Sequence, residues 1–152
     1  MIPAELAAFF QEGVAIHIGT RNASLTPNGA RAIAVRVEAD GVHFEIFLAT
    51  VVSKEILADL ASNGQAAVVF ARPVDDRACQ VKAAFVGTRP ATAQDRDLVM
   101  GQWNGFLQKL EMIGIPRTSL LGWATWPSVA IRLRATALFD QTPGPQAGAP
   151  LA

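Results

Sequence analysis

Several stretches of this chain alternate between apolar and polar residues, which is the two-residue period of a β-strand with one buried face. The clearest stretch runs from Val42 to Ala49, and a second runs from Arg31 to Glu38. Between them lies Asp40-Gly41, a dipeptide that favours the tight turn of a β-hairpin. We therefore predict that these stretches form an antiparallel hairpin with one face in a hydrophobic core.

Strand and helix patterns also cover most of the remaining chain. The other predicted strands are Val14 to Thr20, Ala66 to Arg72, Ala78 to Thr88 and Ser128 to Phe139. The predicted helices are Pro3 to Gln11, Ser53 to Ala61 and Thr92 to Met112. About six strands, mostly in hairpins, with three helices between them predict a mainly β domain built as a small closed or split β-barrel with accessory helices.

The ends of these elements carry recognisable signals. Thr92 with Asp95 resembles a capping box at the start of the longest helix. Ser53 is a suitable N-cap for the helix before it, and Asn63-Gly64 is a suitable end. Residues 21–30 are rich in Asn, Pro and Gly, which predicts a turn region.

In the last strand, the alternation predicts that Ala135 and Ala137 share the core face while Arg132 and Arg134 face the other way. We assign residues 1–140 to one domain and residues 141–152 to a tail rich in Pro, Gly and Ala. Such a composition predicts a segment that is extended and loosely held, or used as an arm.

The stretch from Ala66 to Ala71 is apolar without interruption. Since an antiparallel strand usually has one face in water, we expect this one to be covered on both faces, by a helix or by a partner subunit. The composition agrees, because 51% of the chain is hydrophobic and only 17% is charged. Both observations favour an additional buried surface, and we expect a homodimer.

Charge and cysteine content exclude several classes of function. Lys plus Arg and Asp plus Glu are balanced at 13 each, so the chain has no net attraction for nucleic acid or an anionic membrane. Cys79 is the single cysteine, which excludes an internal disulfide and a four-cysteine zinc site. There is no basic signal-peptide start and no apolar run near the ~20 residues that span a bilayer. We expect a cytoplasmic protein.

Familiar catalytic motifs are absent. The sequence has no Gly-Lys-Ser/Thr phosphate loop, no Gly-x-Ser-x-Gly elbow and no His-Glu-x-x-His motif. Its two histidines, His17 and His43, are too few for a zinc cluster, and we expect both to be solvent-facing. We therefore predict no metal site and assign no catalytic residue.

One group of residues suits a phosphate. Arg31 and Arg36 lie on one predicted strand, and Thr50 to Lys54 begin a predicted helix. A helix N-terminus offers free N–H groups and the positive end of a dipole, and nearby cations and a hydroxyl such as Ser53 would complete a monoester site.

Two residues on a later strand extend this candidate site. Gln80 and Lys82 have the same parity, so they project together, and an amide suits the edge of a flavin ring. The simpler alternative is that Ser53 only caps its helix and that the four cationic side chains are only solvated. These cations are Arg31, Arg36, Lys54 and Lys82. Spacing alone favours that alternative.

Each of the three tryptophans could pack in the core or form part of a ligand pocket. Trp103 on the long helix is most simply a core residue. Trp123 and Trp126 flank a turn before the last strand, where an aromatic ring could form the wall of a flavin pocket. Packing is the favoured interpretation for both, because large aromatic side chains are mostly used for buried area.

The order of short motifs resembles the pyridoxamine 5′-phosphate oxidase-like family of FMN-binding split barrels. The matching stretches are Ile18-Gly19-Thr20, Pro27 to Arg36, Ser53 to Ala67, Arg77 to Lys82 and the tail Asp140 to Gly148. The resemblance covers nearly the whole chain. It implies an antiparallel, Greek-key-like split β-barrel of the FMN-binding type, which forms a two-fold dimer with FMN at the subunit interface.

The resemblance also implies positions for the cofactor-binding residues. Those on the strand that contacts the flavin are Arg31, Ala32, Ile33, Ala34 and Arg36. Thr50, Ser53 and Lys54 match the phosphate-binding cluster, within about one residue of register. Gln80 matches a glutamine that meets the ring edge, and Lys82 projects beside it.

One departure from the family concerns the substrate. The true oxidases end in a strand with an Arg-x-His type motif, whereas this chain has Ile131 to Ala135 without a histidine. We therefore expect an FMN-dependent oxidoreductase of unknown substrate. The alternatives are a non-catalytic flavin-binding or sensor protein, and a member of the same fold that binds a deazaflavin or haem. The lack of a suitable histidine ligand counts against haem.

Overall fold

The computed structural model describes residues 1–151 and has an antiparallel sheet with three α-helices. The strands are β1 (Ala15–Arg21), β2 (Pro27–Ala32), β3 (Ala34–Val37), β4 (His43–Ala49), β5 (Gln65–Ala71), β6 (Ala78–Pro90), β7 (Ser128–Asp140) and β8 (Pro150–Leu151). The helices are α1 (Ala4–Gln11), α2 (Lys54–Asn63) and α3 (Ala93–Met112), with short 3₁₀ turns η1 (Thr50–Val52) and η2 (Arg117–Leu120). The last residue of the predicted tail lies outside the described residues.

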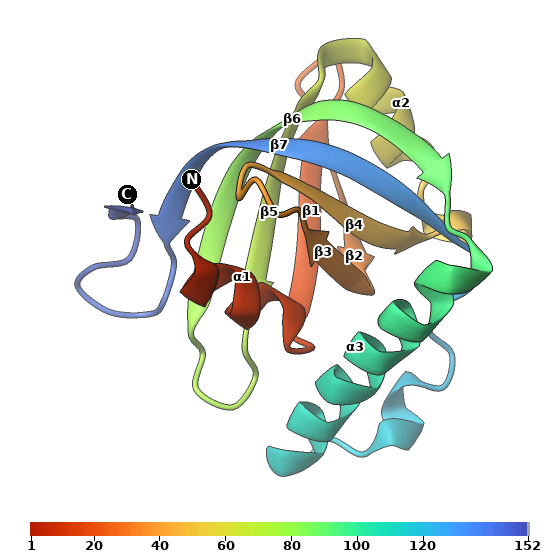
Figure 1. The fold of residues 1–152 in the computed structure, drawn as a ribbon, viewed down its shortest axis with the longest axis vertical. Coiled ribbons are helices and arrows are strands. Elements are labelled where there is room, and N and C mark those ends of the chain that lie inside the picture. Colours follow the sequence, from red (N-terminus) through yellow and green to blue (C-terminus); the bar gives the residue numbers. More distant parts are fainter. Residues whose placement is uncertain (152) are drawn as a thin grey trace.

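The strands follow the order β2-β1-β5-β6-β7-β4-β3, and β8 pairs with β7. Every pairing is antiparallel. The sheet curls into a half-open barrel in which β6 and β7 arch over the other strands, as Figure 1 shows. The predicted mainly β split barrel with accessory helices is confirmed. Among the described residues, no helix is long and apolar enough to cross a membrane.

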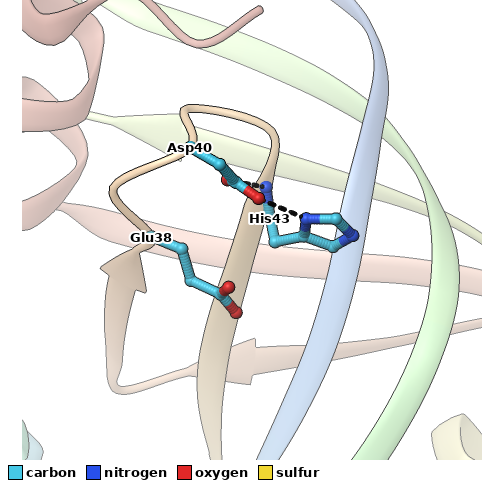
Figure 2. A group of neighbouring side chains, drawn as sticks. All are labelled: Glu38, Asp40 and His43. Atoms are coloured by element: carbon cyan, nitrogen blue, oxygen red, sulfur yellow. Dashed lines mark hydrogen bonds and ion pairs between the residues drawn. The ribbon is translucent and has the colours of Figure 1, made fainter.

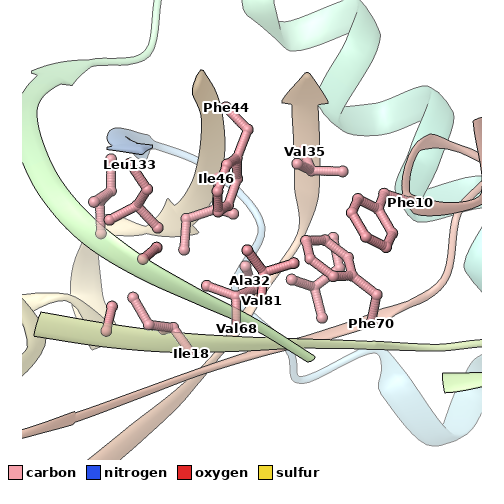
Figure 3. Packing of buried hydrophobic residues seen from close by; sticks show 14 of the residues in the cluster. Phe10, Ile18, Ala32, Val35, Phe44, Ile46, Val68, Phe70, Val81 and Leu133 are labelled. Atoms are coloured by element: carbon pink, nitrogen blue, oxygen red, sulfur yellow. The ribbon is translucent and has the colours of Figure 1, made fainter. Parts of the chain in front are cut away.

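The concave face of the sheet holds the main core. Figure 3 shows Phe10 of α1 packed on Phe70 of β5, with Val68 and Val81 beside them and Leu133 at the other end of the same core. The Phe10 and Phe70 ring centroids are 3.9 Å apart. A second cluster lies on the convex face, where α3 covers part of β3, β4 and β7. It explains why Phe47 is fully buried although it points away from the barrel interior.

The hairpin predicted around Asp40-Gly41 is present as β3 and β4. Its first stretch differs from the prediction, because the chain from Arg31 to Glu38 is not one strand. Its first two residues belong to β2, which pairs with β1, and the pairing changes at Ile33, whose N–H donates to Phe47 O at 2.7 Å. The predicted turn region of residues 21–30 was too long for the same reason, since β2 already begins at Pro27.

The alternation in β7 also changes along the strand. The register between β6 and β7 shifts so that Lys82 pairs with Ala137 while Ala83 pairs with Ala135. This bulge leaves Thr136 as the extra residue and reverses the faces that follow. Leu138 is therefore buried, and the expectation that Ala137 shares the core face was wrong.

The predicted helix signals are largely present. Thr92 and Asp95 form the capping box of α3. Gly64 ends α2 in the left-handed region, with φ at 69°. Ser53 occupies the N-cap position of α2, but its side chain does not cap the helix, because the hydroxyl donates to Thr50 O at 2.8 Å instead.

Two predicted surfaces have a defined place in the fold. Along β5, Ala66, Val68 and Phe70 are buried in the core, while the alternate side chains of Ala67 and Val69 are only partly buried. The described chain therefore covers one face of this strand fully and the other incompletely. The tail turns back on itself, and residues 150–151 pair with β7.

Candidate functional site

The site is built around Arg31, the last outward-facing residue of β2. It borders a pocket of about 400 Å³, which we name the Arg31 pocket. Its lining includes Gly29, Arg31, Ile33, Val51, Val52 and Trp123. These residues come from three separate places in the chain: the junction of β2 and β3, the η1 turn before α2, and the loop that leads into β7.

The Arg31 guanidinium lies against two aromatic rings and lacks a hydrogen-bond partner at one nitrogen. Its Cζ is 4.5 Å from the ring centroid of Trp123 and 5.2 Å from that of Phe106. Its Nη1 is buried, and it is the one buried side-chain nitrogen or oxygen without a partner in the described part of the chain. Burial lowers the pKa of Arg31 from its usual value. An unpaired buried donor is costly, so this nitrogen is suited to an acceptor from a ligand.

Sheet pairing places Arg31 and Gln80 in one row. Arg31 is opposite His17, which is opposite Val69, which is opposite Gln80. All four residues alternate with core residues and therefore share the convex face. Because neighbouring strands are about 4.8 Å apart, Gln80 lies roughly 14 Å from Arg31 along this row.

His17 lies beside Arg31 in this row. Its pKa is lowered, first because burial disfavours the charged imidazolium and second because the Arg31 cation repels it. The row therefore presents a cation, a neutral imidazole and an amide to anything that lies across β2, β1, β5 and β6. His17 was expected to be only a solvent-facing residue, and its place beside Arg31 follows from the strand pairing.

Arg36 has a different environment. Its guanidinium binds Glu45 at 3.1 Å and Asp95 at 2.9 Å, and Arg89 binds the same two carboxylates. Two carboxylates therefore already neutralise two arginines. The structure does not bring Arg36 into the Arg31 pocket, because the strand changes partners at Ile33.

The predicted phosphate cluster borders the Arg31 pocket through its middle residues. Val51 and Val52 line the pocket and are 73% and 46% exposed, which is unusual for valine. Ser53 is buried, whereas Thr50 and Lys54 are exposed. No side chain caps α2, so the N–H groups of its first turn, which follow Val51 and Val52 in the chain, have no side-chain acceptor.

The remaining predicted residues divide between core and surface. Ala32 and Ala34 are buried in the two core clusters, so only their backbone atoms remain for a ligand. Ile33 packs in the second cluster and also lines the Arg31 pocket. Lys82 projects from the same face as Gln80, as expected, but it borders a different hollow.

Trp123 makes a contact that the sequence did not predict. Packing was the favoured role for this residue, but its side chain is 41% exposed and stacks on the Arg31 guanidinium. Its ring also lies near that of Trp103, with 5.9 Å between the ring centroids. The one sequence signal was the aromatic residue in a turn before the last strand; only the fold shows which cation it meets.

A second cluster of polar side chains lies in the turn between β3 and β4. Figure 2 shows Glu38, Asp40 and His43 with their ligand-type atoms near one another. Glu38 accepts from Arg132 with both oxygens, at 2.7 and 2.8 Å. Asp40 accepts the N–H groups of Val42 and His43 and contacts the His43 ring at 2.6 Å. Since these contacts account for the carboxylates, we assign no metal to this cluster.

Comparisons with known proteins identify the fold. No family model matches the sequence, and no curated protein matches it. Among solved structures, an F420 reductase is similar with a TM-score of 0.60 at 16% identity, over 90% of this chain and 97% of that one.

Two further solved structures agree. A Lactobacillus delbrueckii protein assigned as a pyridoxamine 5′-phosphate oxidase has a TM-score of 0.56 at 14% identity, over 90% of this chain and 92% of that one. An FMN-binding protein from Syntrophomonas wolfei has a TM-score of 0.53 at 10% identity, over 90% of this chain and 86% of that one. The chain therefore has the pyridoxamine 5′-phosphate oxidase-like fold, and at these identities the likeness establishes the fold alone.

Proposed function

We propose that this protein is an FMN-binding flavoprotein, and that it acts as an oxidoreductase with a homodimer as its working form. The observation that carries the proposal is the buried, unpartnered Nη1 of Arg31 in a pocket beside the start of α2. A phosphate monoester supplies the missing acceptor, and helix N-termini bind such groups. The fold shared with an FMN-binding protein supports FMN as the ligand.

The chain offers separate roles for several of these residues. Arg31 and the first-turn N–H groups of α2, beginning at Lys54, would hold the phosphate. Trp123 would keep the guanidinium in place from one side. The ring would lie along the row of His17 and Val69, so that the amide of Gln80 meets its edge.

Bound FMN would supply the redox chemistry, and the protein would provide binding, orientation and electrostatics. The Arg31 cation and the uncapped α2 N-terminus make this part of the convex face electropositive, which favours an anionic ligand. Val51, Val52 and Trp123 line the pocket with apolar groups, which would shield a bound ligand from water. These are the contributions that this chain's own residues can make to electron transfer.

The open side of the site supports the proposal of a homodimer. The row from Arg31 to Gln80 crosses β5 at Val69, which the chain leaves only partly buried. A second copy packed over this row would cover Val69 and enclose the ring. We therefore place FMN between the subunits.

Binding of FMN to the purified full-length chain tests the proposal. We expect a yellow complex in which Arg31→Gln weakens FMN at least tenfold, because a hydrogen bond to a charged group contributes about 1.5–3 kcal/mol. Riboflavin, which has no phosphate, should bind equally to both proteins. Arg134→Gln is the control, since Arg134 is exposed and lies on β7 away from the pocket. A chain that binds neither flavin would contradict the proposal.

A deazaflavin is the second candidate, supported by the structural likeness to an F420 reductase. Competition between FMN and F420 for binding to the chain, monitored by flavin fluorescence, distinguishes the two ligands.

A non-catalytic role is the other alternative. Rapid reduction of the bound flavin by NADH or NADPH, with reoxidation by an added acceptor, would support the enzyme and exclude a passive carrier. Haem has little support, because neither His17 nor His43 lines the Arg31 pocket.

A further inference from the structure

The convex face of the sheet has a strongly uneven charge. Strands β1, β2, β5 and β6 contain no Asp or Glu, although the whole chain is neutral. In the described residues, Arg21, Arg31 and Lys82 on these strands form no ion pair. Six other arginines do, which are Arg36, Arg72, Arg77, Arg89, Arg117 and Arg132. The face is therefore electropositive without a counter-charge of its own.

Two of these cations border a hollow that is separate from the Arg31 pocket. The hollow has a volume of about 510 Å³ and includes Gly19, Arg21, Gly64, Ala67 and Lys82 in its lining. It shares no lining residue with the Arg31 pocket. Its volume falls within the range of small-molecule sites.

Strand pairing explains why the hollow exists. Gly19 is opposite Ala67, and Ala67 is opposite Lys82. Beside Lys82, this row across β5 and β1 therefore has only the small side chain of Ala67 and none at Gly19. Gly64 ends α2 at the same place and also has no side chain. The floor is therefore open backbone, and the larger charged side chains stand at its sides.

Hydrogen bonds hold the Arg21 side chain and the Lys82 backbone at the rim. The Arg21 guanidinium donates to Gln65 Oε1 at 3.2 Å and to Asn22 O at 3.4 Å, which uses two of its five N–H donors. Lys82 sits at the bulge between β6 and β7, where the Thr136 hydroxyl donates to its carbonyl at 3.0 Å. Bulges of this kind often direct a side chain toward a site.

We propose that this hollow binds the phosphate group of a small molecule other than the flavin. A guanidinium and an ammonium together give two positive charges, which match a phosphate monoester, and no carboxylate on these strands competes for them. Because the hollow and the Arg31 pocket lie on the same convex face, the ligand is a second reactant or effector of that face. This site goes beyond the proposed flavin site and does not depend on it.

Inorganic pyrophosphate is the probe, titrated by calorimetry into the full-length chain without flavin. We expect saturable binding that Arg21→Gln and Lys82→Gln each weaken about tenfold. The matched control is Arg134→Gln, which removes one charge from the same face outside the hollow and should change the affinity less than twofold. No saturable binding, or equal loss in all three variants, would overturn the proposal.

A second titration separates this site from the flavin phosphate. With FMN-saturated protein, pyrophosphate should bind with nearly the same affinity and should not displace FMN. Displacement would show that the hollow and the flavin share one phosphate site and would overturn the proposal. The proposal would also be overturned if Lys82→Gln weakened a dimer and left pyrophosphate binding unchanged, because the hollow would then hold a carboxylate of the second copy. If FMN does not bind at all, the flavin proposal fails and the first titration still decides this one.

Discussion

At the scale of single residues, Arg31 and Arg36 show how position decides the use of a side chain. They are five residues apart in a motif that suggested one shared role. Arg36 is held by Glu45 and Asp95, whereas Arg31 has an unpartnered nitrogen between two aromatic rings. The difference arises because the strand changes partner between them, so the two side chains enter different environments.

Trp123 is expected to report ligand binding. Its indole stacks on Arg31, so FMN in the adjacent pocket should quench its fluorescence. We expect Trp123→Phe to remove most of the quenching while the affinity for FMN falls less than threefold, because phenylalanine keeps a ring over the cation. Trp126→Phe is the control and should leave the quenching nearly unchanged, since Trp126 packs near Arg96 instead. Equal loss of quenching in both variants would contradict the assigned position.

At the scale of secondary-structure elements, α3 completes the edge of the sheet. The side-chain amide of Gln102 accepts from Val35 N at 2.9 Å and donates to Val35 O at 2.8 Å, as another strand would. Helix α3 passes close to the backbone at Gly13, which has φ at 82°. This approach is possible because glycine has no Cβ, and a Cβ there would lie 2.6 Å from Gln102 O. A free strand edge invites pairing with other chains, and this contact blocks it.

Gln102→Ala is therefore expected to destabilise the fold. It leaves the N–H and C=O groups of Val35 without partners, at a cost of about 2–4 kcal/mol in the free energy of unfolding. Gln108→Ala on the same helix is the control, because Gln108 is exposed and should change stability by less than about 0.5 kcal/mol. Urea denaturation of both variants measures the difference. Equal effects would show that the amide contact is not needed.

The start of α3 is fastened to the sheet by Asp95. Its pKa lies well below the usual range, first because Arg89 donates hydrogen bonds to it. A lowered folded pKa stabilises the protein above the ordinary carboxyl pKa, roughly 3.9, and that contribution is lost as the pH falls toward the folded value. Asp95→Asn should therefore cost about 1–3 kcal/mol at pH 7 and progressively less as the pH falls below about 4, with part of the cost still present at pH 2 because the folded carboxyl is still ionised there.

Unfolding by urea at several pH values checks this expectation. Asp97→Asn is the matched control, since Asp97 is exposed on the same turn of α3 and forms no ion pair among the described residues. A stability loss from Asp95→Asn that is the same at pH 7 and pH 2 would mean that the carboxylate charge is not what matters.

Much of the element level could be predicted from the sequence. Alternation and turn residues located the hairpin of β3 and β4, and the capping box located the start of α3. The division between β2 and β3 at Ile33 was not predictable, because alternation continues through it and the break depends on which strand is the neighbour. The reversal at Thr136 in β7 has the same origin, since a bulge is a property of two paired strands.

At the scale of the whole molecule, the proposed dimer decides whether the proposed flavin site is complete. Val69→Asp places a charge in the middle of the partly buried convex face of β5. We expect light scattering to give a dimer for the unmodified chain and a largely monomeric Val69→Asp variant, because a buried unpaired carboxylate opposes association. The variant should also bind FMN at least tenfold more weakly.

Val74→Asp is the control for this change. Val74 is 38% exposed in the turn between β5 and β6, away from the proposed interface. It should leave the mass and the FMN affinity unchanged. A monomeric unmodified chain at micromolar concentration would count against the shared site, whatever its affinity for FMN.

The sequence by itself determined that this is a mainly β domain with a barrel core, because the period of apolar residues and the turn chemistry act locally along the chain. It also contains the residues of the proposed phosphate-binding site. Only the tertiary structure decided which of these residues meet. Arg31 joins Val51, Val52 and Trp123 because β2, η1 and the loop before β7 converge there, and such long-range contacts leave no periodic trace in the sequence.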